Sequence, residues 1–425
     1  MSAIMSVEEL TRKLVAYNTV SSPVPGQSTR EIADFASNIL EAGGFKVMQF
    51  PYYSKIPDKK ADTDKEQVIE KVNIVALKGG SEPLFGLSGH MDVVPVAGWK
   101  VKSKPFEMIQ SEDRFYGRGV ADMKLFLAIS MIAGSRISSH TLKQPFGIYL
   151  TSDEEVGCVG VRQLFGHEPE IESSLSDTSI ELTSNDIAPV PRYVIIGEPT
   201  GLMPINLHKG YMFLEIKIEV ISRRSKKDKR HSSNPDGGHS VIKHGLPEVL
   251  QALNRLEADL RGIKDDRFKI PFPTINPGIV RMGDGAAKNV LAPLCFIDIE
   301  VRNLPGQDPR VIVDLVRDIV QRSLAGIEWI QATVKRMRAP TLPMETSFDS
   351  KITYVVREIS GEKDIQPGVA YNTEGGTFNK HGSESIIFGP GSIDQAHSPS
   401  EFVLASYFED RVVVLYQDII RMLCC

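Results

Sequence analysis

The sequence has few cysteines, no excess of positive charge and no apolar run long enough to cross a bilayer. Four cysteines are too few for a disulfide framework, and the N-terminus lacks the apolar segment of a signal peptide. A net charge of −5 gives no reason to expect nucleic acid or an anionic membrane as a partner. We therefore expect a globular protein of the reducing cytoplasm.

The chain ends on two adjacent cysteines, Cys424 and Cys425. This pair does not have the C-a-a-X form of a prenylation site. We expect a frayed end without a lipid.

The composition is that of an ordinary globular protein, with 41% hydrophobic and 24% charged residues. A length of 425 residues exceeds what one hydrophobic core usually serves, so two domains are expected.

Strands and helices alternate in the first half of the chain. Ser6 and Glu9 form a capping box that opens one helix, and Gly43 with Gly44 ends a second. Strand patterns follow at Asn73–Leu77, Leu84–Ser88, Phe146–Thr151 and Tyr193–Gly197, and a largely buried helix is predicted at Met123–Ile137. This alternation predicts an α/β fold with a mostly parallel sheet.

The pattern changes near Asn206. Apolar and charged residues alternate over Phe213–Ile221, which is typical of an antiparallel strand with one wet face. Two more strands, Phe296–Arg302 and Trp329–Val334, and two helices, Pro247–Leu260 and Pro309–Ser323, predict an α+β unit of the β-α-β-β-α-β type. We expect residues 206–338 to be an inserted domain, with 1–205 and 339–425 forming the main domain.

Two charged segments interrupt these patterns. Asp58–Glu66 reads as a charged loop, and the strongly basic run from Arg223 to Arg230 reads as a solvated hairpin tip. The alternative for the basic run is an electrostatic funnel for an anionic substrate.

Acidic or histidine side chains stand at the ends of several predicted elements. They are His90 and Asp92 after one strand, Asp122 before a helix, Asp153, Glu154 and Glu155 after a second strand, Glu198 after a third, and His397 on a Gly-rich loop. Ligands of open α/β sheets collect outside the carboxyl ends of the strands. Carboxylates gathered there would repel one another unless a cation lay among them.

Two histidines with several carboxylates suit a borderline metal such as zinc. One carboxylate shared by two ions would make a dinuclear site. Each of these side chains, taken alone, is better explained as a polar residue that faces solvent at the end of a strand. The whole set, each member at an element end, favours a metal site.

Five stretches in this order resemble the family of dinuclear zinc amidohydrolases and peptidases. They are "GHMDVVPVAGW", "YGRGVADMK", "TSDEEVG", "IIGEPT" and "GPGSIDQAH". The resemblance runs from about residue 5 to residue 420. Within the family, "HKG", "NTEGGTF" and "GPGSIDQAHSPSEF" are most similar to the acetylornithine deacetylase group.

The resemblance implies roles for the residues at the strand ends. His90 and Glu198 would hold one metal ion, Glu155 and His397 the other, and Asp122 would bridge both. Asp92 would accept a hydrogen bond from the far nitrogen of His90. Glu154 would be the general base, because its neighbour Glu155 is occupied by metal while Glu154 stays free to carry a proton.

The resemblance also implies a homodimer formed through the inserted domain. In the family a histidine of this domain enters the partner's active site as an oxyanion donor. His231 matches that histidine and His239 is the alternative, because "RRSKKDKR" replaces the usual approach to it. A loop histidine without a catalytic role remains a third interpretation.

Four further residues match substrate-binding positions of the family. They are Asn289, Arg302, Gly375 and Gly376. Arg302 could bind an α-carboxylate in a bidentate manner, or it could be paired with Glu300. The two glycines could let the backbone approach a substrate, or they could form a tight surface turn.

By resemblance, the expected reaction is deacetylation of N2-acetyl-L-ornithine to L-ornithine and acetate, in arginine biosynthesis. Another N-acyl-amino-acid hydrolase, acting on acetylcitrulline or succinyl-diaminopimelate, or a dipeptidase could use the same metal core. The expected cofactor is a pair of divalent ions, with zinc favoured and cobalt possible in principle. A catalytically silent relative that binds amino-acid derivatives or partner proteins is the alternative of a different class.

Overall fold

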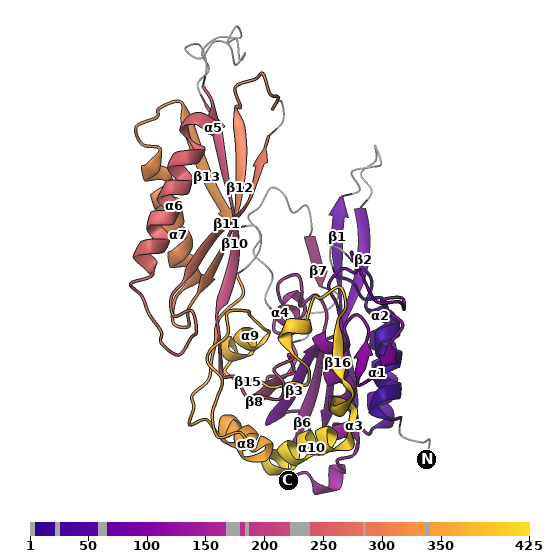
Figure 1. Cartoon of the computed structure of the whole chain (residues 1–425). Helices are drawn as coiled ribbons and strands as arrows, with labels where there is room; N and C mark the ends of the chain where they lie inside the picture. Colours follow the sequence, from indigo (N-terminus) through magenta and orange to yellow (C-terminus); the bar gives the residue numbers. More distant parts are fainter. Residues whose placement is uncertain are drawn as a thin grey trace.

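The computed structural model describes residues 5–21, 26–57, 66–166, 179–182, 187–221, 239–283, 286–336 and 340–425. Two separate sheets, each covered by helices, dominate these residues (Figure 1). The larger sheet and its helices fill the lower part of the view, and the smaller sheet lies at upper left. This arrangement confirms the predicted fold class.

Seven described strands form the larger sheet, in the order β15-β8-β3-β6-β2-β1-β7. Their bounds are β1 (Lys46–Pro57), β2 (Glu66–Lys78), β3 (Phe85–His90), β6 (Phe146–Thr151), β7 (Ser179–Leu182), β8 (Tyr193–Ile196) and β15 (Glu384–Ile387). The four strands from β15 to β6 run parallel, whereas β2, β1 and β7 are added antiparallel.

The parallel strands β3, β6 and β8 are buried throughout, as strands covered on both faces should be. Alternate residues of β6 enter two different apolar clusters, with Ile148 in one and Tyr149 in the other. The first cluster is built with α1 (Val7–Ala16), α2 (Arg30–Ala42), α3 (Leu125–Ser135), α8 (Lys351–Ser360) and α10 (Asp410–Cys424). The second is built with α4 (Val159–Leu164) and α9 (Gly375–Lys380).

The starts of two predicted helices, α1 and α3, are defined by local structure. The side chain of Ser6 accepts from the amide of Glu9, whose side chain accepts from the amide of Ser6, and this capping box opens α1. The apolar segment predicted as a helix from Met123 forms α3, and a short π-helical segment, η1 (Val120–Lys124), precedes it. Asp122 lies within η1 and is therefore fixed against the start of a buried helix.

The smaller sheet has the order β11-β12-β10-β13 among the described residues. Its elements are β10 (Gly210–Val220), α5 (Val241–His244), α6 (Leu246–Leu260), β11 (Thr274–Met282), β12 (Leu294–Asn303), α7 (Pro309–Ser323) and β13 (Ile330–Arg336). One face of this sheet packs against α6 and α7 in a core of its own. The chain order is the β-α-β-β-α-β unit that the alternating pattern predicts.

Short elements complete the description. They are β4 (Ile109–Ser111), β5 (Arg114–Tyr116) and β16 (Phe402–Leu404) in a three-stranded sheet, β9 (Leu207–His208) paired with β14 (Met344–Glu345), and the 3-10 turns η2 (Ser139–Thr141), η3 (Ile393–Gln395) and η4 (Ala405–Phe408). No described helix has the length and apolar character needed to cross a membrane.

The prediction of a frayed C-terminus is wrong. Helix α10 continues to Cys424, whose side chain is buried in the main core. The backbone carbonyl of Cys424 accepts hydrogen bonds from the amides of Lys143 and Gln144. The residues of the charged loop from 58 to 65 and of the basic run from Arg223 to Arg230 lie outside the described residues.

Candidate metal centre

The first group of candidate ligands forms where β3 ends. His90 is the last residue of β3, and its Nε2 lies 2.9 Å from Oδ1 of Asp122 and 4.0 Å from Oε1 of Glu198. Glu198 follows β8, the strand beside β3. All three side chains are buried. The parallel strands therefore deliver His90 and Glu198 to one edge of the sheet, and η1 delivers Asp122 to the same place.

The second group shares Asp122 with the first. His397 Nε2 lies 3.0 Å from Oε2 of Glu155 and 3.4 Å from Oδ2 of Asp122. Glu155 lies just beyond β6, and His397 lies on the loop that follows β15. The side chain of His397 is 57% exposed, in contrast to the other candidate ligands, so this group faces the solvent.

Both groups have the composition and spacing of a metal site. In each group, one ligand atom per residue lies within 4.8 Å of the others. Histidine nitrogens and carboxylate oxygens are the ligands that zinc and related ions accept. Oε1 of Glu155 is buried and has no hydrogen-bond partner among the described residues. A buried carboxylate oxygen without a partner is costly, and a cation at this place would satisfy it.

The electrostatics of the cluster also favour added positive charge. Burial raises the pKa of Glu198 and of Glu155, and the charge of Asp122 raises both further. Burial alone would lower the pKa of His90, yet its hydrogen bond to Asp122 and the charge of that carboxylate raise it well above its usual range. Hydrogen bonds to Asp122 and Glu155 raise the pKa of His397 to about 11. The residues present thus fit a pair of divalent cations.

Asp92 is close to His90, but it makes a different contact from the predicted one. The ring nitrogen Nδ1 of His90 lies 2.9 Å from the backbone carbonyl of Asp92 and 3.7 Å from its carboxylate. The two carboxylate oxygens of Asp92 instead accept hydrogen bonds from the backbone amides of Glu154 and Glu155, at 3.1 and 3.2 Å. Asp92 therefore ties the strand end that carries His90 to the turn that carries both acids.

A second buried interaction holds the same turn from the other side. Lys71 Nζ lies 2.7 Å from Oδ1 of Asp153, and the hydroxyl of Tyr52 donates to Oδ2 at 3.0 Å. Lys71 and Tyr52 are fully buried, and Asp153 has a φ of +57°. This left-handed conformation is unfavourable for a residue with a side chain, and the ion pair stabilises it immediately before Glu154.

Glu154 is 9% exposed and belongs to neither ligand group. Burial raises the pKa of its carboxyl group well above the usual range, and Glu155, Glu374 and Asp92 raise it further while His90 opposes them. The thiol of Cys158 donates to Oε1 of Glu154 at 3.3 Å. A raised pKa moves this carboxyl group towards the range in which a side chain can both take up and release a proton, as a general base and acid must.

Sequence reasoning missed several buried polar groups around this site. The amide of Asn372 donates to Sγ of Cys158, which links Glu154 to the "NTEGGTF" segment. Glu374 in that segment is 1% exposed and accepts a hydrogen bond from Ser88 on β3. Burial raises its pKa to about 7. The sequence shows Glu374 and Cys158 only as single residues close to two of the motifs, and neither indicates its partner.

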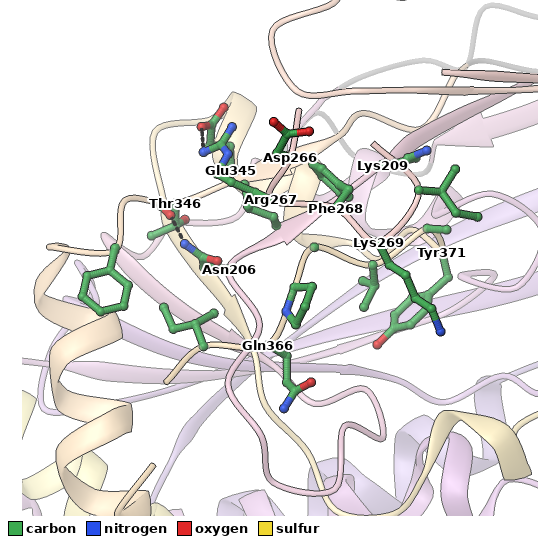
Figure 2. A pocket seen from close by; sticks show the side chains of 18 of the residues that line it. Asn206, Lys209, Asp266, Arg267, Phe268, Lys269, Glu345, Thr346, Gln366 and Tyr371 are labelled. Atoms are coloured by element: carbon green, nitrogen blue, oxygen red, sulfur yellow. Dashed lines mark hydrogen bonds and ion pairs between the residues drawn. The ribbon is translucent and has the colours of Figure 1, made fainter. Parts of the chain in front are cut away.

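A cleft with a volume of about 1390 Å³ is lined by Lys209, Phe268 and Tyr371 among other residues, and none of its lining residues is a candidate metal ligand. Figure 2 shows Arg267, which follows α6, paired with Glu345 of β14, and Tyr371 among the other residues that line the cleft. Burial raises the pKa of Tyr371, and the charges of Glu198 and Asp122 raise it further. Tyr371 is therefore a lining residue whose hydroxyl is influenced by the charges of two candidate ligands.

Among the described residues of the insert, no predicted site residue is paired with a candidate ligand. His239 stacks on Trp329, with ring centroids 3.8 Å apart, and Asn289 is exposed in the turn before β12. Arg302 pairs with Glu300 at 2.5 Å, which is the alternative interpretation of that residue, and donates to the carbonyl of Ala370. His231 lies outside the described residues.

Gly375 and Gly376 open α9 and are buried, so they do not form a surface turn. A Cβ on Gly376 would lie 2.0 Å from the carbonyl oxygen of Leu342, and one on Gly375 would lie 2.4 Å from Sδ of Met344. The close approach that excludes a side chain here is to the protein's own chain, and this packing accounts for both glycines.

Comparison with known proteins places the chain among metal-dependent hydrolases. The model of peptidase family M20/M25/M40 matches residues 86–421. The acetylornithine deacetylase of Myxococcus xanthus is 31% identical over 396 residues, covering 92% of this chain and 90% of that protein. The acetylornithine deacetylase of Proteus mirabilis is 30% identical over 407 residues, covering 94% and 92%.

Solved structures share the fold at lower identity. An M20-family metallo-carboxypeptidase from Sulfolobus solfataricus is 16% identical with a TM-score of 0.68, covering 98% of each chain. A dinuclear metal-binding peptidase of the M20 family from Bacillus subtilis is 13% identical with a TM-score of 0.61, covering 98% of this chain and 97% of that one. The family match and the relatives, taken with the ligand cluster, lead to one conclusion: this chain belongs to peptidase family M20/M25/M40 and is a metal-dependent amidohydrolase.

Proposed function

We propose that this protein hydrolyses the acetyl amide of N2-acetyl-L-ornithine, releasing L-ornithine and acetate in arginine biosynthesis. The observation that carries the proposal is the pair of ligand groups sharing Asp122, beside the buried Glu154. The named substrate is supported by similarity to acetylornithine deacetylases over more than nine-tenths of the chain.

The proposed cofactor is two divalent ions, zinc in the first place and cobalt as the alternative. His90 and Glu198 would hold one ion, Glu155 and His397 the other, and Asp122 both. Ions bound there would supply Lewis acidity towards the scissile carbonyl and would make a water molecule more acidic. Three carboxylates and two histidines would leave these ions enough positive charge for that task.

Glu154 is the proposed proton carrier. Cys158 occupies Oε1 of Glu154, which leaves Oε2 to take a proton from the attacking water. The same carboxyl group then gives that proton to the amide nitrogen as the carbon–nitrogen bond breaks, so ornithine leaves as a neutral amine. Asp92 and the Lys71–Asp153 pair keep Glu154 and Glu155 in their separate directions during this transfer.

Assembly and location are further parts of the proposal. We propose that residues 206–338 form a lid and dimerisation domain on a catalytic domain made of 1–205 and 339–425. The protein would be a cytoplasmic homodimer, with His231 of the insert as the residue that reaches the partner subunit's active site. His239 is less suited to this role because its ring is stacked on Trp329.

A substrate panel tests the named reaction. It contains N2-acetyl-L-ornithine, N-acetylcitrulline, N-succinyl-diaminopimelate and a dipeptide, each assayed with and without a chelator. The highest kcat/KM on acetylornithine, abolished by the chelator, is the expected result. Metal-dependent hydrolysis of only another compound in the panel would contradict acetylornithine as the substrate, but it would agree with the proposed amide hydrolysis. Binding of acetylornithine without release of acetate would indicate a silent relative.

A further inference from the structure

Glu401 is a buried carboxylate that the mechanism above does not use. It lies four residues after His397 and immediately before β16, and its side chain is 1% exposed. The carboxylate belongs to neither candidate ligand group. A buried charge of this kind is retained only where its surroundings bind it strongly.

The carboxylate of Glu401 binds the segment that carries Asp122. Oε1 accepts hydrogen bonds from the backbone amides of Ala121 and Asp122, at 2.8 and 3.1 Å. Oε2 accepts from the amide of Gly119 at 2.9 Å and from Nη1 of Arg118 at 2.7 Å. Both oxygens are thus fully engaged, and three of the four donors are backbone amides of the turn that ends at the shared ligand.

The backbone of Glu401 strengthens the same connection. Its carbonyl accepts a hydrogen bond from the amide of Gly117 at 3.2 Å. The next residue, Phe402, pairs with Tyr116 between β16 and β5. The segments around Asp122 and His397 are therefore joined at Glu401, although more than 270 residues separate Asp122 from His397 in the chain.

His397 is the ligand that most needs such a fixed point. Its side chain is 57% exposed, and its φ of +61° is unusual for a residue other than glycine. His90, in contrast, is fixed by the buried strand β3 and by its own contact with the carbonyl of Asp92. Loss of Glu401 would therefore disturb the His397 side of the cluster more than the His90 side.

We propose that Glu401 is a positioning residue for the outer metal ion, the one assigned to Asp122, Glu155 and His397. It acts by fixing the backbone at Asp122 and the loop that carries His397 relative to each other. The inference rests on the proposed metal pair and adds a residue outside the ligand set. Residues that orient metal ligands typically change metal affinity about 10–100-fold when replaced.

Glu401→Gln is the decisive variant. A glutamine side chain directs N–H groups either at the amides of Ala121 and Asp122 or at the amide of Gly119 and the guanidinium of Arg118. Buried donors therefore lose their acceptor whichever way it turns. Glu215→Gln is the matched control, because Glu215 is also a buried glutamate, bound by Arg281 on the smaller sheet.

The measurement is a calorimetric titration of each metal-free protein with Zn²⁺, with no substrate present. The wild-type chain and Glu215→Gln should bind two ions. Glu401→Gln should bind one ion as wild type does and the second about 10–100-fold more weakly. Its isotherm should resemble that of His397→Ala and differ from that of His90→Ala. The double variant Glu401→Gln with His397→Ala should bind Zn²⁺ about as tightly as His397→Ala alone.

Other outcomes would overturn the inference. Two ions bound with wild-type affinity by Glu401→Gln, or equal weakening of both, would contradict a role at the outer ion. If Glu401→Gln does not fold, as judged by circular dichroism, Glu401→Asp keeps the charge at a shorter reach and must show the same selective loss. A wild-type chain that binds fewer than two ions would reject the proposed metal pair, and the role of Glu401 with it.

Discussion

His90 Nε2 and Asp122 Oδ1 lie 2.9 Å apart, although one residue ends a strand and the other lies in the segment before a helix. This contact places a histidine and a carboxylate where one cation could bind both. Because the other oxygen of Asp122 faces His397, the same carboxylate serves two groups.

Replacing Glu154 with glutamine should separate proton transfer from metal binding. Glu154 belongs to neither ligand group, so Glu154→Gln should retain the wild-type content of two ions. Turnover should fall at least about 10²–10⁴-fold, because the amide cannot carry the proton. Metal analysis and steady-state kinetics on the same preparation check this. A variant with wild-type turnover would remove Glu154 from the mechanism.

The thiol of Cys158 should tune Glu154 modestly. Cys158→Ala removes a hydrogen bond to Oε1, which is worth a factor of about 2–10 in kcat, and it should leave the metal content unchanged. Cys158→Ser keeps a donor and should recover part of the loss. Cys295→Ala is the matched control, since Cys295 is buried in the smaller sheet. Equal kinetics in Cys158→Ala and wild type would show that the hydrogen bond has no catalytic effect.

The Lys71–Asp153 pair should be essential for stability. Lys71→Met leaves a buried carboxylate without its cation, and breaking a buried pair in this way costs about 3–5 kcal/mol of unfolding free energy. The double variant Lys71→Met with Asp153→Asn removes both charges and should be more stable than Lys71→Met alone. Urea unfolding of the metal-free proteins measures both effects. A Lys71→Met protein as stable as wild type would show that the Lys71–Asp153 pair does not stabilise the fold.

The ion pair between Arg30 and Glu70 should give a stability term that depends on pH. The hydrogen bond from Arg30 lowers the pKa of Glu70 below its ordinary value of 4.5. A carboxylate whose pKa is depressed in the folded state stabilises the protein above its unfolded pKa, and that stabilisation is lost as the pH falls through the folded pKa. Arg30→Met should therefore cost about 0.5–1 kcal/mol at neutral pH and progressively less below pH 4.5.

The control for this prediction is the same substitution in a Glu70→Gln background. There the effect of Arg30→Met should depend much less on pH, because Glu70 no longer titrates and the more exposed Asp34, 3.3 Å from Nη1 of Arg30, is the remaining acidic partner. Thermal unfolding between pH 3 and pH 7 would check both backgrounds. An effect of Arg30→Met that grows on acidification would reverse the sign and exclude this ion pair as its source.

Regular patterns predicted much of the fold. The alternation over Phe213–Ile221 corresponds to β10 (Gly210–Val220), and the capping box at Ser6 opens α1. The antiparallel strands β1 and β11 were not located from the sequence. Pro51 interrupts the pattern of β1, and β11 contains Pro277 and is exposed over much of its length.

Four of the candidate ligands were predictable because each stands next to a patterned strand or helix, and His397 was predictable because its Gly-rich loop resembles the family motif. The groups that hold them were not, because their partners are distant in the chain. Glu401 meets Asp122 across 279 residues, and Lys71 meets Asp153 across 82. Such pairs are set by tertiary packing, and neither partner differs in the sequence from an ordinary surface charge. The carboxylate of Asp92 was likewise assigned to His90, whereas two backbone amides occupy it.

Hydrolysis as a function of bound Zn²⁺ tests the central claim most directly. Metal-free protein would be titrated with Zn²⁺ while acetate release from N2-acetyl-L-ornithine and metal content per chain are both recorded. We predict no activity without metal, activity that saturates at two ions per chain, and loss of both ions' tight binding in Asp122→Asn. Full hydrolysis by a chain that carries no metal, or by Asp122→Asn with unchanged metal content, would contradict the account.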